Sequence, residues 1–193
     1  MNKQLFSIAG LAAGFAAAFS ATVQAEPFFA QMVLQSVTFQ VESPNNSSIN
    51  QVIVRAESPE GTLGPMQFEA DGTITNVEVG DLNADGYPEI YVYINSAGSG
   101  SYGSLVAYAS NRNKSLSEIY LPSFEDDPAI LQGYMGHDEF AIGEGTLVRR
   151  FPIYLEGDTN AQSTGGTRQI QYKLEAGEAG WVLRQDRVLD LEF

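Results

Sequence analysis

Short runs of alternating apolar and polar residues, separated by turn-forming residues, constrain the fold of this chain more than any other feature of its sequence. Residues 36–42, for example, alternate Val37, Phe39 and Val41 with polar neighbours, which is the pattern of a strand with one buried face. Residues 89–94, which read EIYVYI, are apolar or aromatic almost throughout, so we expect a central strand there. No segment repeats with a helical period over a helical length, and the best helical candidate is residues 127–134.

The same criteria predict ten strands across the chain. They cover residues 36–42, 51–56, 73–79, 89–94, 105–110, 117–121, 139–142, 146–154, 168–174 and 181–192. Proline, glycine, asparagine and aspartate cluster between them and mark turns. We therefore expect one all-β domain over residues 26–193, folded as a single-domain antiparallel β-sandwich or flattened barrel with a protruding loop rich in Gly, Ser and Tyr.

Residues 1–25 have the organisation of a secretory signal peptide. A basic residue, Lys3, precedes an apolar, alanine-rich run, and Val23 and Ala25 put small residues at the two positions that a signal peptidase reads. We expect cleavage after Ala25 and a periplasmic or extracellular location for the domain that follows. No stretch after residue 25 is long and apolar enough to span a bilayer, so a membrane is not an expected partner.

The composition excludes several classes of function. The chain has 24 Asp and Glu against 10 Lys and Arg, a formal net charge of -14, and no cysteine. Nucleic-acid binding needs a basic face, and without cysteine there is no disulfide, thiol nucleophile or cysteine-ligated metal. A Ser-His-Asp triad would have to use the single histidine, His137, which we expect to be a turn residue. We expect a protein that is not an enzyme and needs no cofactor.

Residues 96–104, which read SAGSGSYGS, join two of the predicted strands. Part of this stretch matches G-x-G-x-x-G, but no helix follows it, so a dinucleotide site is not expected. The glycines permit a tight, protruding tip that carries hydroxyls and one aromatic ring, and tyrosine is a good interface anchor. The candidate binding residues are Gly98, Ser99, Gly100, Ser101, Tyr102 and Gly103. The alternative is a glycine-rich hairpin loop without a function.

Charge placement favours a binding role for this loop. No acidic residue occurs between Ile90 and Ser117, although the chain as a whole is strongly acidic, and Arg112 and Lys114 lie in the same window. An acidic body with an acid-free tip suits a basic partner that has carboxylates in a cleft, because the body attracts the partner and the tip donates hydrogen bonds without repulsion.

Residues 81–89, which read DLNADGYPE, have the oxygen-bearing side chains of a calcium loop at Asp81, Asn83, Asp85 and Glu89. The spacing does not fit an EF-hand, because Val92 stands where the bidentate glutamate belongs. A nine-residue calcium loop of the type found in propellers remains open. The alternative is a turn whose Asx side chains bond to their own backbone.

Arg149 and Arg150 are adjacent within a predicted strand. Because successive side chains of a strand point to opposite faces, we expect one of the two to be partly buried and paired with an acidic residue.

Several long stretches resemble the family of periplasmic inhibitors of invertebrate-type (I-type) lysozyme. They cover residues 81–108, 114–122, 133–140, 147–154, 157–161 and 164–174. The family's inhibitory loop has a Ser-Gly-x-Tyr signature, which matches Ser99, Gly100, Ser101 and Tyr102 here. The resemblance implies a β-rich periplasmic protein, a homodimer, and Ser99 and Tyr102 as the pair whose hydroxyls lie near the catalytic carboxylates of lysozyme. The expected partner is a cationic glycoside hydrolase, I-type lysozyme.

Two other functions compete with lysozyme inhibition. One is a calcium-dependent periplasmic or secreted binding module that uses residues 81–89. The other is a secreted hydrolase with a carboxylate pair that the spacing of the acids does not single out.

Overall fold

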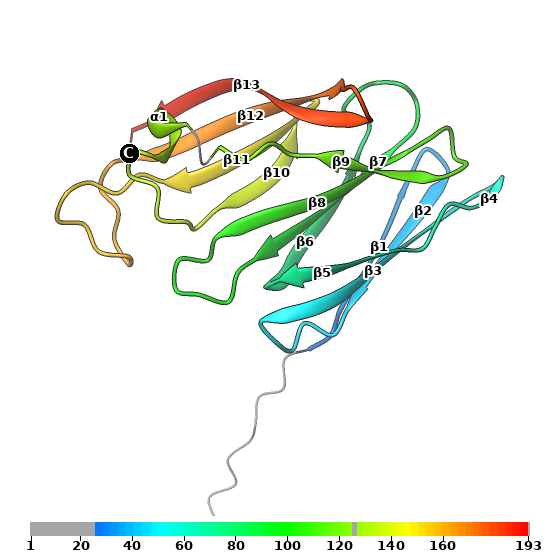
Figure 1. Cartoon of the computed structure of the whole chain (residues 1–193), viewed down its shortest axis with the longest axis horizontal. Helices are drawn as coiled ribbons and strands as arrows, with labels where there is room; N and C mark the ends of the chain where they lie inside the picture. The colour runs from blue at the N-terminus through cyan, green and yellow to red at the C-terminus, as the bar shows by residue number, and fades with distance from the viewer. Residues whose placement is uncertain (1–25, 125–126, 193) are drawn as a thin grey trace, which may run out of the picture.

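The computed structural model describes residues 26–124 and 127–192, which form two β-sheets (Figure 1). The first sheet has five strands in the order β1-β2-β3-β4, with β5 paired to β3. These strands are β1 (Phe28–Leu34), β2 (Val37–Ser43), β3 (Ile49–Ser58), β4 (Gly61–Thr62) and β5 (Met66–Asp71).

The second sheet has eight strands in the order β10-β11-β12-β13-β9-β8-β7-β6. They are β6 (Thr73–Gly80), β7 (Glu89–Asn95), β8 (Gly103–Ser110), β9 (Leu116–Tyr120), β10 (Glu139–Gly143), β11 (Thr146–Pro152), β12 (Thr167–Ala176) and β13 (Trp181–Leu191). Neighbouring strands are antiparallel except β9 and β13, which pair in parallel over two positions.

The eight-stranded sheet curls until its two edge strands, β6 and β10, come together. Glu78 of β6 links the edges, because its Oε2 accepts a hydrogen bond of 2.8 Å from the backbone N–H of Ile142 in β10. The same oxygen accepts a hydrogen bond of 2.5 Å from the hydroxyl of Tyr93 in β7. The result is a flattened, nearly closed barrel with the five-stranded sheet packed against its outside, which confirms the predicted all-β class.

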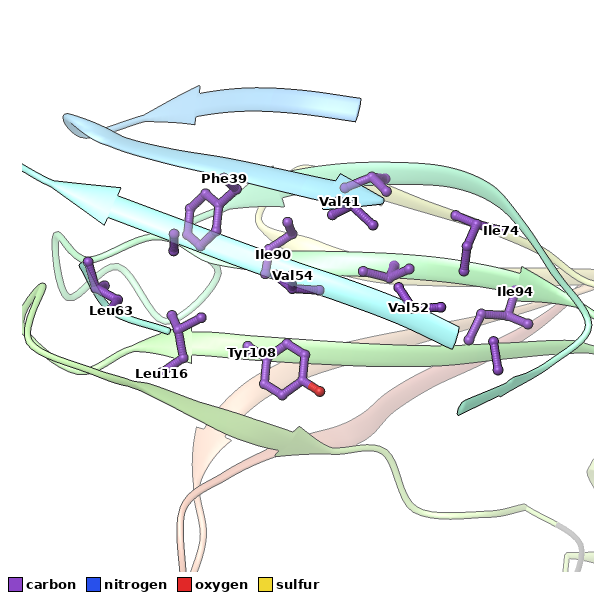
Figure 2. Close-up of a cluster of buried hydrophobic side chains, with 14 of the residues drawn as sticks. Phe39, Val41, Val52, Val54, Leu63, Ile74, Ile90, Ile94, Tyr108 and Leu116 are labelled. Carbon is purple, nitrogen blue, oxygen red and sulfur yellow. The ribbon is translucent and has the colours of Figure 1, made fainter. Parts of the chain in front are cut away.

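Strand β7 lies between two hydrophobic cores. Ile90, Val92 and Ile94 point into the core shared with the five-stranded sheet (Figure 2). Tyr91 and Tyr93 point into the interior of the curled sheet. All five side chains are at most 2% exposed, so β7 is the central strand that the sequence predicts.

All ten predicted strands are present, and three further strands, β1, β4 and β5, were not predicted. β1 is an edge strand with Phe29 and Val33 more than half exposed, so its apolar residues do not alternate with polar ones as the period-two criterion requires. The predicted helix over residues 127–134 is wrong in length. α1 covers only Pro128–Leu131, because Gln132 is already extended and Gly133 has a φ of +76°. No helix in the described residues is long and apolar enough to cross a membrane.

Candidate functional site

Residues 96–102, which we call the tip loop, connect β7 to β8 at one end of the flattened barrel (Figure 1). Three hydrogen bonds close the loop on itself. The N–H of Ser96 donates to the carbonyl of Tyr102 at 2.9 Å, the N–H of Tyr102 donates to Ser96 Oγ at 3.0 Å, and the N–H of Ser101 donates to the carbonyl of Gly98 at 3.0 Å. Ser99 is exposed and the Tyr102 side chain is 50% exposed, so the loop presents a hydroxyl and a phenol to solvent.

A second segment, residues 133–138, packs against the tip loop and supports it. The N–H of His137 donates to the carbonyl of Gly100 at 2.6 Å. A Cβ atom on Gly136 would lie 2.1 Å from that carbonyl oxygen, and Gly136 has a φ of +88°, so only glycine fits there. The ring of Tyr102 meets that of Tyr134 edge to face, with the centroids 5.6 Å apart. The ring and backbone of the loop are therefore both supported.

The base of the site is a buried ion pair between Asp138 and Arg149. Asp138 Oδ1 lies 2.7 Å from Arg149 Nε, and the side chains are 0% and 11% exposed. Asp138 Oδ2 accepts from the N–H of Gly103 at 2.8 Å and from the hydroxyl of Tyr134 at 2.7 Å. Burial, with the hydrogen bond to Asp138 next in size, raises the pKa of Tyr134 above its ordinary value. The guanidinium lies 4.3 Å from the centroid of the Phe124 ring.

Residues 153–166, which form the long loop between β11 and β12, are the third segment of the site. This loop projects on the same side of the molecule as the tip loop (Figure 1). Asn160 in this segment joins all three parts of the site. Its Nδ2 donates to the carbonyl of Ser99 at 2.8 Å, and its Oδ1 lies 3.1 Å from Nε2 of His137.

Asp158 holds the third segment in shape. It accepts hydrogen bonds from the N–H of Leu155, from the N–H of Thr164 and from the hydroxyl of Thr164. These donors, the Leu155 N–H first, lower the pKa of Asp158 below its ordinary value. The tip loop is thus held by parts of the chain up to 61 residues away in sequence.

The six candidate binding residues, Gly98 to Gly103, lie together in and beside the tip loop, with Gly103 as the first residue of β8. His137 lies in the irregular segment before β10, with a φ of +58°, and its backbone supports the tip loop. The prediction that one of the two adjacent arginines is buried and paired is confirmed by Arg149.

The site differs in two ways from what the acid-free stretch between Ile90 and Ser117 suggested. Arg112 and Lys114 are in the turn after β8, at the far end of that strand, so they do not belong to the tip. Asp138, Tyr134 and Asn160 were not predicted, because no local pattern distinguishes them from other polar and aromatic residues.

Residues 81–89, which we call the acidic loop, connect β6 to β7 at the opposite end of β7 (Figure 1). One carboxylate oxygen from each of Asp81, Asp85 and Glu89 lies within 4.8 Å of the others. Asn83 belongs to the same loop, and its Oδ1 accepts from the N–H of Asp85 at 3.0 Å. Burial, reinforced by the charges of Asp81 and Asp85, raises the pKa of Glu89 to about 8. These four residues offer the hard oxygen ligands that calcium prefers.

Comparison with known proteins assigns the chain to a family. The model of the family described as periplasmic lysozyme inhibitor of I-type lysozyme matches residues 40–130. A crystal structure of this inhibitor from Aeromonas hydrophila is 31% identical in sequence over 47% of this chain and 84% of its own, with a TM-score of 0.42. A crystal structure of the Aeromonas hydrophila inhibitor in complex with Meretrix lusoria lysozyme is 30% identical over 47% of this chain and 80% of its own, with a TM-score of 0.41.

A search of curated proteins finds no match. The family model and the sequence identity over most of the Aeromonas hydrophila inhibitor agree, and the matched residues 40–130 contain the resembling stretches 81–108 and 114–122. The chain belongs to the family of periplasmic lysozyme inhibitors of I-type lysozyme.

Proposed function

We propose that this protein inhibits I-type lysozyme in the periplasm and that its tip loop enters the active-site cleft of the enzyme. The observation that carries the proposal is the tip loop itself, which is exposed and uncharged and is supported by two other segments of the chain. Members of the family are protein inhibitors and not enzymes, and the related Aeromonas hydrophila inhibitor has been crystallised with a lysozyme.

The chemistry of the tip loop suits the cleft of a glycoside hydrolase. Such enzymes cleave between two carboxyl groups, one acting as an acid and one as a nucleophile or base. The hydroxyls of Ser99 and Tyr102 can donate hydrogen bonds to these groups, and the loop brings no acidic residue that would repel them. The ring of Tyr102 occupies space that the substrate needs.

The supports of the loop reduce the entropy that binding costs. Ser99 is held through its carbonyl by Asn160, Gly100 through its carbonyl by His137, and Tyr102 through its ring by Tyr134. A loop that already has its bound shape loses little conformational freedom on association, so more of the contact energy appears as affinity. The net charge of -14 further speeds encounter with a cationic enzyme.

Lysis of bacterial cell walls, followed by turbidity, tests the proposal. The purified protein is titrated against I-type, chicken-type and goose-type lysozymes, and we expect dose-dependent protection from the I-type enzyme. Tyr102→Ala should raise the concentration needed for half inhibition by roughly tenfold or more, as for a central aromatic anchor.

Tyr120→Ala is the matched control, because Tyr120 is 62% exposed on β9, outside the tip loop and its two supports. It should inhibit like the unchanged protein. Absence of inhibition of the I-type enzyme would contradict the function, whereas equal potency of the two tyrosine variants would contradict only the role of the tip loop.

Residues 1–25 lie outside the described residues, and their role is a separate part of the proposal. We infer that they direct export and are removed after Ala25. Mass spectrometry of the protein recovered from the periplasm should give a chain that begins at Glu26. An intact Met1 in that fraction would contradict cleavage.

A further inference from the structure

The acidic loop brings together acids that no positive group in the described residues neutralises. Asp81, Asp85 and Glu89 place one carboxylate oxygen each within 4.8 Å of the others. None of the salt bridges in residues 26–124 and 127–192 includes any of the three. Like charges at this separation repel one another, so the arrangement needs an explanation.

Turn formation accounts for part of the acidic loop. Asp81 accepts hydrogen bonds from the N–H groups of Asp85 and Gly86, each at 3.0 Å, and Asp85 accepts from the N–H of Tyr87 at 2.8 Å. Side-chain bonds of this kind build Asx turns without any ligand. They explain why aspartates occupy these positions, but they give no reason for a glutamate at position 89.

Glu89 is the residue that a turn does not explain. It is the first residue of β7 and is fully buried. Its Oε2 accepts a hydrogen bond of 2.8 Å from the N–H of Leu82, which fixes the carboxyl group against the acidic loop. Its Oε1 is buried and has no hydrogen-bond partner. A buried oxygen without a partner is costly, and most buried polar atoms in proteins have one.

We propose that the acidic loop binds a calcium ion, with Asp81, Asp85 and Glu89 as carboxylate ligands and Asn83 as an amide ligand. A cation shared by the three carboxylates gives the buried Glu89 oxygen its missing partner and removes their mutual repulsion. Calcium takes six to eight oxygen ligands in flexible geometry, so backbone carbonyls and water can complete the shell. The position of the loop makes the ion a link between β6 and β7.

Calorimetric titration and thermal unfolding of the metal-free protein test the site. We expect calcium to bind with heat exchange and to raise the melting temperature by about 5 to 10 °C when its concentration is a hundredfold above the dissociation constant. Magnesium, which demands stricter octahedral geometry, should raise it less. The chelator EDTA should reverse the shift.

Two variants assign the ion to the acidic loop. Asp85→Asn removes a carboxylate from an exposed residue, so the variant should fold and its calcium affinity should fall about tenfold or more. Glu57→Gln, at an exposed position on β3, is the matched control and should bind calcium like the unchanged protein.

Three outcomes would overturn the proposal. One is a melting temperature unchanged by calcium, which would leave Glu89 as a protonated acid beneath an Asx turn. Another is an Asp85→Asn variant that retains full calcium affinity. A third is an equal or larger shift with magnesium. The proposal does not rest on lysozyme inhibition, and its test uses no lysozyme.

Discussion

The two ends of β7 each lie beside a buried acidic residue, and the two residues are held in opposite ways. At the tip loop, both oxygens of the buried Asp138 have donors, namely Arg149 on one and Gly103 and Tyr134 on the other. At the acidic loop, only one oxygen of the buried Glu89 has donors. The chain itself completes the first arrangement, whereas the second lacks a partner that an ion would supply. One strand therefore joins a part of the molecule where the buried acid has a donor for each oxygen to a part where one buried carboxylate oxygen has no hydrogen-bond partner.

The largest expected effect is a loss of stability when Arg149, the cation of the buried ion pair beside the tip loop, is removed. Arg149→Ala leaves Asp138 buried without its ion pair, and breaking a buried pair from one side costs about 3–5 kcal/mol of unfolding free energy. Chemical denaturation measures the loss.

Arg184→Ala is the control, because Arg184 pairs with Glu175 while both side chains are more than half exposed. We expect it to cost no more than about 1 kcal/mol. Equal losses of unfolding free energy for the two arginine variants would contradict this account, because the structure beside the tip loop would then not depend on the buried pair of Asp138 and Arg149.

An intermediate effect is expected at the tether between the tip loop and the third segment. Asn160→Ala removes the hydrogen bond to the Ser99 carbonyl and the contact with His137. One net hydrogen bond is worth about 1 kcal/mol, so inhibition of I-type lysozyme should weaken by about fivefold with little change in stability.

Asn111→Ala provides the control for this tether. Asn111 lies in the turn after β8, where its side chain bonds to Ser115, far from the tip loop. Its inhibition constant should match that of the unchanged protein. If Asn160→Ala also inhibits with unchanged potency, the third segment has no part in fixing the tip loop.

The smallest expected effect is a dependence on pH in the third segment. The pKa of Asp158 is lowered in the folded state from 3.8, so its stabilising contribution is present above that pH and is lost as the pH falls through the lower folded value. Asp158→Asn should therefore lower the melting temperature slightly at neutral pH, and the difference from the unchanged protein should vanish once the pH is below the lowered pKa of the folded state. A difference that persists undiminished in strong acid would mean that the charge of Asp158 is not what holds the segment.

Local sequence patterns predicted ten of the thirteen strands and the exposed residues of the site, but not the contacts that hold the site together. Glycine spacing and the lack of acids marked the tip loop, and period-two alternation placed Val37, Phe39 and Val41 in the core. Asp138 and Asn160 escaped detection because their partners, Gly103 and Ser99, lie 35 and 61 residues away in sequence. Such contacts depend on the order of strands in the curled sheet, which the pattern within each strand does not determine.

We propose that inhibition depends on the shape in which the tip loop is held, and two glycine variants test this most directly. Gly136→Ala puts a Cβ atom against the carbonyl of Gly100, whereas Gly145→Ala, at a similarly positive φ in the hairpin between β10 and β11, meets no atom within 4 Å. Both variants bear the backbone strain of alanine at positive φ, but only the first displaces the loop. The measurement is the inhibition constant of each folded variant for I-type lysozyme. We predict that it rises at least about tenfold for Gly136→Ala, as when an interface anchor is lost, and stays unchanged for Gly145→Ala. Equal inhibition by both would contradict the claim.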